Sequence, residues 1–240
     1  DNLLLREMYI RNKIYLANRR QLSEQRRIML YLGKKYVSVK NGFATLADKV
    51  FIGEMPFKQF VIPVIKASTG AWQSAFFPYD KEGKPYSNKI IFQNEAVAHY
   101  LNYYKDYLLK QNTEQEHPNW YLYGRTQALK DVFKNKLVIS TLIRDVASIK
   151  FNSAPVGTGV YSGLYILTDI PQADIQQIIL NEDFISYVRI LRNYKSGGYY
   201  TFNSKAIEVY LNFKLTEKYD KIRSMSTQKS RILECDLQFV

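Results

Sequence analysis

Short apolar runs, separated by turn signals, recur between residues 36 and 167 and are the feature that most limits the possible folds. Runs of this length, some of them alternating with polar residues, are typical of β-strands. The glycine- and proline-containing stretch between residues 79 and 89 predicts a hairpin that joins two of them. The expected strands are residues 36–42, 50–52, 60–62, 75–79, 89–92, 137–140 and 159–167.

Helical periodicity marks the remaining segments, because apolar residues recur there at three- and four-residue spacing. Helices are expected over residues 1–35, 94–110, 172–192 and 204–213. The predicted fold class is therefore α+β: a basic N-terminal helical arm, then a largely antiparallel twisted sheet with flanking helices. The expected organisation is a helical arm or linker over 1–35, one domain over 36–213 and a polar C-terminal tail over 214–240.

The charge balance points to the class of partner. The chain has 34 lysines and arginines against 22 acidic residues, a net charge of +12, and 20 tyrosines. Lysine and arginine side chains can bind phosphates, and tyrosines can stack on bases or donate hydrogen bonds to them. This composition therefore suits a nucleic-acid-binding protein. It equally suits a basic protein with a tyrosine-rich core. Residues 1–35 hold nine cations and three acids, which indicates either an arm along a phosphate backbone or the solvated face of a packing helix.

Several classes of protein are not expected. The single cysteine, Cys235, excludes an intramolecular disulfide and a multi-cysteine zinc site. No apolar run approaches 18 residues and the N-terminus does not resemble a signal peptide, so no membrane partner is expected and the expected localisation is cytoplasmic.

Catalytic signals are weak. Asp80 and Glu82 lie two residues apart in one turn, whereas a metal-dependent nuclease needs carboxylates that converge from neighbouring strands. The glycines of residues 157–163 precede a strand-like run and not a helix, which argues against a cofactor-binding loop. His99 and His117 are isolated and form neither a metal set nor a triad. No catalytic or metal-ligating residue is predicted.

Four stretches, in this order, resemble the target-recognition domain of type II adenine-specific DNA methyltransferases, including those fused to restriction enzymes. They lie within residues 36–213 and none of them is a catalytic motif. The stretches are NGFATLADKVFI (41–52), WYLYGRTQAL running on to KLVI (120–129 and 136–139), VYSGLYI (160–166) and NYKSGGYYTFNSK (193–205).

The resemblance implies sequence-specific binding of double-stranded DNA, so that a catalytic domain can flip and methylate one adenine. The catalytic half of such enzymes carries a glycine-rich S-adenosylmethionine loop and a Pro-Pro-Tyr motif, and this sequence contains no Pro-Pro. The resemblance therefore implies no cofactor in this chain, S-adenosylmethionine in a catalytic domain of the same or another chain, and no activity by this chain alone. The alternatives are a stand-alone specificity subunit of a restriction-modification system and a complete enzyme with an unfamiliar site.

The candidate DNA-binding residues come from the basic arm and from the first, second and fourth stretches. Arginine can pair with guanine and glutamine with adenine in the major groove, while lysine, serine and glycine amides suit phosphate. Two other interpretations stay open: Arg125 caps a helix or pairs with an acid, and the Gly-Gly pair is a helix cap beside two core tyrosines. The candidates are Arg125, Thr126, Gln127, Lys130, Lys195, Ser196, Gly197, Gly198, Tyr199, Tyr200, Lys40, Asn41 and Arg20.

Overall fold

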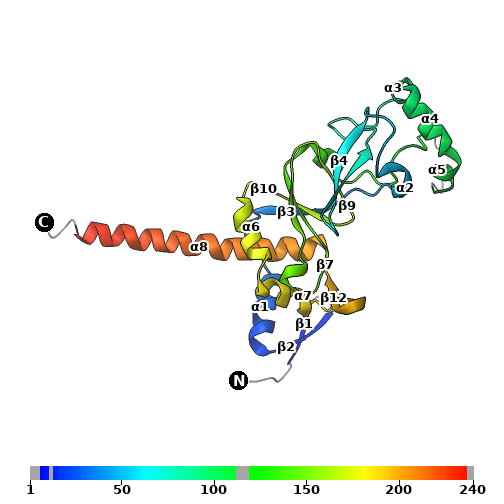
Figure 1. The fold of residues 1–240 in the computed structure, drawn as a ribbon. Coiled ribbons are helices and arrows are strands. Elements are labelled where there is room, and N and C mark those ends of the chain that lie inside the picture. The colour runs from blue at the N-terminus through cyan, green and yellow to red at the C-terminus, as the bar shows by residue number, and fades with distance from the viewer. Residues whose placement is uncertain (1–5, 11–12, 112–118, 237–240) are drawn as a thin grey trace. The chain divides into compact units, whose positions relative to one another are not determined.

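The computed structural model describes residues 6–10, 13–111 and 119–236. The fold is α+β, as the sequence predicts, and its chain divides into two compact units (Figure 1). Unit 1 comprises residues 1–38, 144–147 and 168–240, and unit 2 comprises residues 39–143 and 148–167. No helix among the described residues combines the length and the apolar character needed to cross a bilayer.

Unit 2 is built on two sheets. The first has the strand order β3-β10-β6-β8, with β6 antiparallel to both of its neighbours. The second has the order β5-β4-β9, in which β4 and β5 form an antiparallel hairpin and β9 runs parallel to β4. The strands of these two sheets are β3 (Val37–Asn41), β4 (Val61–Lys66), β5 (Ala71–Phe76), β6 (Lys136–Ile139), β8 (Phe151–Ala154), β9 (Gly159–Tyr161) and β10 (Leu164–Thr168). The short strand β7 (Leu142–Ile143) belongs to neither sheet.

Short helices complete unit 2 and cover the second sheet. Their buried residues, such as Val50, Ile91 and Leu101, pack in one core with Phe76 and Tyr123. The helices are α2 (Asp48–Phe51), α3 (Asn88–Phe92), α4 (Glu95–Tyr103), α5 (Lys105–Gln111), and the 3₁₀ turns η1 (Lys130–Phe133) and η2 (Val146–Ser148). The last of these, η2, lies where the chain passes between the two units.

Unit 1 is mainly helical. The hairpin of β1 and β2 precedes α1, and α8 packs against both α1 and α6. Asn212 of α8 accepts hydrogen bonds from the backbone N–H groups of Tyr36 (2.6 Å) and Val37 (3.0 Å), which fixes the start of β3 on the helix. The elements are β1 (Arg6–Ile10), β2 (Lys13–Ala17), α1 (Arg19–Met29), α6 (Gln172–Ile179), α7 (Glu182–Ile190), β11 (Tyr194–Lys195), the 3₁₀ turn η3 (Ser196–Gly198), β12 (Tyr199–Thr201) and α8 (Ser204–Asp236).

The prediction of a helix throughout residues 1–35 is wrong for its first half. Residues 6–10 and 13–17 pair as antiparallel strands, with Arg6 opposite Ala17, and 19–29 is the helical part of the described residues up to 35. Residues 1–5 and 11–12 lie outside the described part of the chain. Tyr15 and Ala17 lie two residues apart and are both buried, and residues at this spacing share one face of a strand. Asn18 then starts α1 with a capping box, in which its side chain and that of Gln21 satisfy each other's backbone N–H groups.

The helix expected over 204–213 is longer in the structure, because α8 continues from Ser204 through Asp236. No glycine or proline interrupts this stretch, and its polar residues bind neighbouring helices instead of ending the helix. Lys214 pairs with Glu24 of α1 at 2.5 Å, and Lys218 pairs with Asp174 of α6 at 2.8 Å. Residues 237–240 lie outside the described part of the chain.

Two strands expected near the second sheet are helices in the structure. Residues 48–51 form α2, with only Ile52 bridging to Ala75, and residues 88–92 form α3. Three or four apolar residues are too few to distinguish the helical period from the strand period. The hairpin partner of β5 is therefore β4. The strands expected near 60–62, 137–140 and 159–167 are confirmed, as are the helices at 94–110 and 172–192, each as two helices separated by a short break.

Candidate nucleic-acid interface

The first candidate surface lies in unit 2, where the structure brings together two of the resembling stretches. Residues 41–46 and 124–128 lie side by side, and we call them the loop pair. Ala44 forms an antiparallel bridge with Arg125, the Gly124 N–H donates to the Thr45 carbonyl at 3.1 Å, and the Gln127 Nε2 donates to the Gly42 carbonyl at 3.4 Å. Two segments 85 residues apart in sequence thus form one surface.

The candidate side chains project from the exposed side of this loop pair. Asn41, Arg125, Thr126 and Gln127 are all exposed. Arg125 forms no ion pair with any carboxylate that the structure describes, and it caps no helix, so neither alternative for it is supported. An exposed guanidinium with five donors is free to approach a guanine edge or a phosphate.

Buried aromatic residues support the loop pair from below. Phe43 and Tyr123 pack with their ring centroids 5.1 Å apart. The Tyr123 hydroxyl donates to the Phe76 carbonyl at 2.5 Å, and its backbone N–H donates to the Tyr79 hydroxyl at 2.6 Å. Burial raises the pKa of Tyr123 and that of Tyr79, so both hydroxyls stay protonated, and the Tyr123 hydroxyl keeps the proton that it donates. The exposed residues of the loop pair therefore lie on a buried, hydrogen-bonded aromatic layer.

Lys40 and Lys130, two further candidates, flank a buried carboxylate. Asp131 is only 4% exposed, and it binds Lys40 at 2.7 Å, Lys134 at 2.8 Å and the Tyr165 hydroxyl at 2.8 Å. Burial would raise the pKa of Asp131, but the hydrogen bonds from Lys134, Lys40 and Tyr165 outweigh burial and lower it to about 2. Lys40 and Lys130 are both exposed, and Lys40 also forms an ion pair with Asp131.

The second candidate surface is the β11–β12 hairpin of unit 1, where Tyr194 pairs with Tyr200 and Lys195 pairs with Tyr199. Gly197 and Gly198 form its turn with φ values of 72° and 75°. The interpretation of the glycines as a helix cap is thus wrong, because they join two strands and α8 begins only at Ser204. The left-handed backbone explains why the turn needs both glycines.

Arginines surround the tyrosines of this hairpin. The Arg144 guanidinium lies 5.5 Å from the Tyr199 ring centroid, and the Arg189 guanidinium lies 5.9 Å from that of Tyr200. Tyr199 and Tyr200 are half-buried, and Tyr194 is 59% exposed. They are not core residues, so rings and cations are presented together, as stacking on nucleic acid requires.

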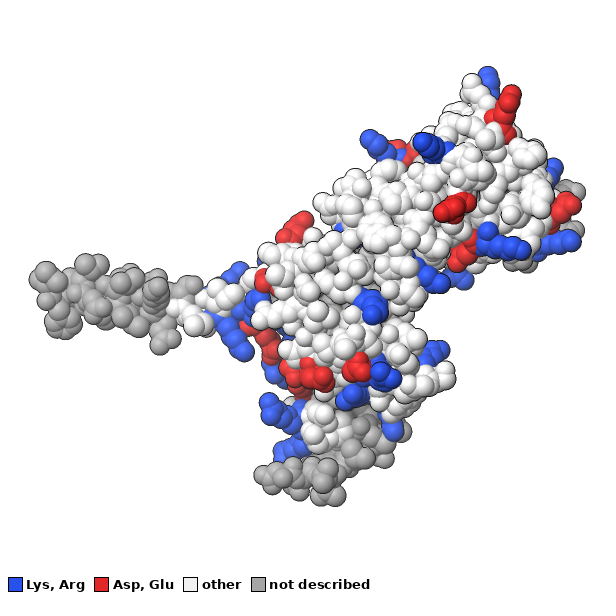
Figure 2. Space-filling view, in the orientation of Figure 1, with Lys and Arg blue, Asp and Glu red and all other residues white. Residues whose placement is uncertain are grey.

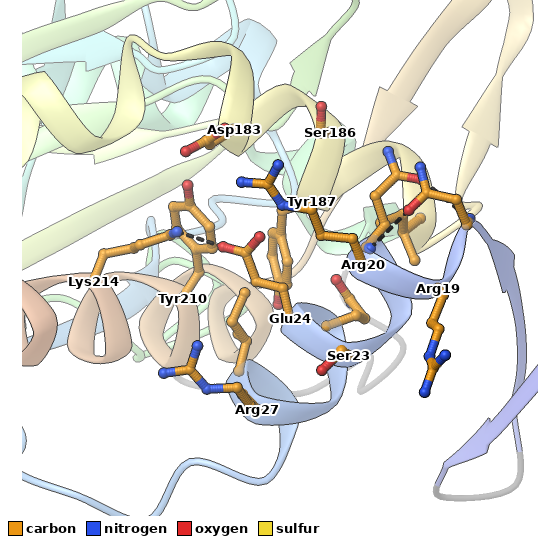
Figure 3. A pocket seen from close by; sticks show the side chains of 15 residues that line it. Arg19, Arg20, Ser23, Glu24, Arg27, Asp183, Ser186, Tyr187, Tyr210 and Lys214 are labelled. Atoms are coloured by element: carbon orange, nitrogen blue, oxygen red, sulfur yellow. Dashed lines mark hydrogen bonds and ion pairs between the residues drawn. The ribbon is translucent and has the colours of Figure 1, made fainter. Parts of the chain in front are cut away.

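Arg20, the candidate from the N-terminal segment, lines a groove of about 1180 Å³ in unit 1. Its side chain extends from α1 toward α7, where Asp183 and Ser186 lie (Figure 3). Glu24 and Lys214 form an ion pair in the same groove. The groove therefore mixes both signs of charge.

Sequence reasoning missed several residues of these surfaces. Leu46 and Ala128 of the loop pair have left-handed backbones with φ values of 60° and 71°. Arg144 comes from a segment far from the hairpin in sequence, and Arg189 comes from α7, the helix that precedes the hairpin. No local pattern could have identified these residues, because their positions follow only from the way the chain folds back on itself.

The charge distribution and the titratable groups limit the chemistry. On the face that Figure 2 shows, basic and acidic side chains of the described residues are interspersed, without one continuous basic field. Within the described part of the chain, no three His, Cys, Asp or Glu side chains are placed to hold a metal ion. The two candidate surfaces offer donors, cations and aromatic rings.

Comparison with known proteins adds no assignment. No protein-family model matches the chain, and no curated protein is significantly similar to it in sequence.

Proposed function

We propose that this chain binds double-stranded DNA in a sequence-specific manner, as the target-recognition part of a restriction-modification adenine methyltransferase. A catalytic domain, in the same or another chain, would bind S-adenosylmethionine and methylate the adenine that the bound DNA presents to it. The proposal combines the order of the four stretches with the composition of the two candidate surfaces.

The loop pair is the observation that most favours the proposal. It joins the first two stretches through the Ala44–Arg125 bridge and leaves an arginine and a glutamine exposed two residues apart. Their long side chains match the donor and acceptor pattern of guanine and adenine in the major groove. The loop pair would supply base contacts, and the cations of the β11–β12 hairpin would supply phosphate contacts.

The first test separates base contacts from phosphate contacts. Preferred duplexes are selected from a random library with the full chain, and affinity is measured by fluorescence anisotropy. Arg125→Ala and Gln127→Ala are each expected to lose about 1–3 kcal/mol of discrimination at particular base pairs. Lys81→Ala is the charge control, because Lys81 is an exposed cation in the turn after Tyr79. Equal weakening on every sequence by Arg125→Ala would contradict base readout.

The second test concerns DNA binding as such and the absence of catalysis. The affinity for duplex should fall with salt by about 0.9 log units per log of salt for each phosphate contacted. The full chain with S-adenosylmethionine and the selected duplex should transfer no methyl group. An affinity for duplex DNA that does not change with salt concentration would argue against DNA as the ligand. Methyl transfer by the chain would establish a complete enzyme.

A further inference from the structure

Leu46 combines two unusual properties at the edge of the loop pair. It is 50% exposed, and its φ is 60°, in the left-handed region. A bulky non-glycine residue in that region is an outlier, because its side chain crowds its own backbone. Such conformations persist only where the surroundings impose them, and they cluster at functional sites.

The residues around Leu46 impose this conformation. The buried Thr45 hydroxyl accepts from the Ala47 N–H at 3.0 Å and also binds Asp48. The Thr45 carbonyl accepts from the Gly124 N–H at 3.1 Å. The residues on both sides of Leu46 are thereby held, and the turn between them directs an apolar side chain outward.

The Leu46 side chain packs against Gly124. A Cβ built on Gly124 would lie 2.2 Å from Leu46 Cδ1 and 2.6 Å from Cγ, so the leucine side chain lies directly over the glycine. Gly124 has an ordinary φ, so its missing side chain serves this close approach and not a special backbone conformation. The leucine thus lies beside Arg125, the next residue.

We propose that Leu46 contacts the 5-methyl group of a thymine in the major groove, next to the bases read by Arg125 and Gln127. This inference rests on the proposed function. Glutamine pairs with adenine, and the thymine of the same base pair presents its methyl group on the same groove edge. Leu46 supplies the apolar surface that this methyl group needs, which neither Arg125 nor Gln127 offers.

The test replaces the methyl group and the leucine separately. Each thymine of the selected duplex is replaced in turn by deoxyuridine, which lacks only the methyl group. For the unmodified chain, one replacement should weaken binding about fourfold, the equivalent of one buried methyl group. For Leu46→Ala, binding to the thymine duplex should be weaker, and the same replacement should then have no further effect.

Two further variants guard against a purely structural effect. Gly124→Ala keeps the leucine but displaces its side chain, so it should also remove the thymine preference. Leu32→Ala is the control, because Leu32 is 94% exposed and belongs to unit 1. It should leave the thymine preference intact. Melting temperatures of all variants show whether each protein is folded at the temperature of measurement.

The outcomes separate this inference from the proposed function. If the chain selects a DNA sequence but no deoxyuridine replacement matters, or the loss persists in Leu46→Ala, the thymine contact is wrong and DNA recognition stands. If no duplex is bound or preferred, both are wrong. A Gly124→Ala protein that is folded and still prefers thymine would also overturn the placement of Leu46.

Discussion

At the scale of single residues, Asp131 shows how a buried charge is stabilised. Its carboxylate is 6% exposed and is bound by Lys40, Lys134 and Tyr165. Beneath it, the Lys136 ammonium donates to the Asp131 and Lys134 carbonyls, each at 2.8 Å. Burial lowers the pKa of Lys136 to about 8, against the attraction of Asp131. The buried polar groups of this cluster therefore satisfy one another's hydrogen bonds, and removing one group leaves its partners unsatisfied.

The depressed pKa of Asp131 predicts a loss of stability in acid. The unfolded carboxyl binds a proton near pH 4, whereas the folded one does so only near pH 2. In that interval the unfolded state holds more protons, so the free energy of unfolding decreases as the pH falls from about 4 to about 2. The contribution is roughly 2 kcal/mol, fully present above pH 4.

Asp131→Asn should be less stable at neutral pH and should lack this part of the acid dependence. Urea unfolding at several pH values measures both effects. Asp106→Asn, at an exposed carboxylate in α5, is the control and should keep the acid dependence of the unmodified chain. An Asp131→Asn protein with an unchanged pH profile would show that Asp131 does not carry the effect.

At the scale of elements, the β11–β12 hairpin combines a turn that needs a left-handed backbone with candidate DNA-binding side chains. A Cβ at Gly198 would meet only Arg144 Cδ, at 4.0 Å, so space does not require the glycine. The φ of 75° at this position does require glycine, because β-branched residues are strained in the left-handed region. A valine at this position would therefore disturb the turn, whereas asparagine tolerates the left-handed region.

The prediction for the hairpin follows from that difference. Gly198→Val should destabilise the protein by about 1–3 kcal/mol, and Gly198→Asn by clearly less. Thermal melting measures both.

On DNA, Lys195→Ala should weaken binding to all sequences alike and reduce the salt dependence, since Lys195 is an exposed cation. Sequence-selective weakening by Lys195→Ala would place it among the base-contacting residues instead.

At the scale of the whole molecule, the chain forms two units that are each discontinuous in sequence. Residues 39–167 contain all of unit 2 and only four residues of unit 1. Two core clusters of unit 2, around Phe76 and around Val138, lie wholly within that range. Unit 1, in contrast, is assembled from both ends of the chain.

A protein limited to residues 39–167 should therefore fold alone. We expect a cooperative thermal transition and dispersed amide resonances, because a unit with its own core keeps its stabilising contacts. Residues 168–240 alone should not fold cooperatively, because Leu22 and Ile28 of α1 complete the core of unit 1. A non-cooperative transition of 39–167 would show that unit 2 depends on unit 1.

Features that depend on neighbours in the chain could be predicted from the amino-acid sequence alone. The α+β class, the helix that Asn94 caps and the strands near 137–140 and 159–167 all follow from local periodicity and capping. Local signals failed where two periods fit equally well, as at 6–17 and 88–92. There, burial of Tyr15, Ala17 and Ile91 against distant residues decided between strand and helix.

Only the tertiary structure decided which candidate residues share a surface. Arg125 and Gln127 could be singled out in sequence for their chemistry, but their position beside Ala44 and Gly42 follows from contacts between distant segments. Leu46 carried no sequence signal, since an exposed leucine with a left-handed backbone is defined by its surroundings. The physical reason is that sequence periodicity indicates which face of a helix or strand is buried. The composition of a surface depends instead on which helices, strands and loops lie next to one another in the folded chain.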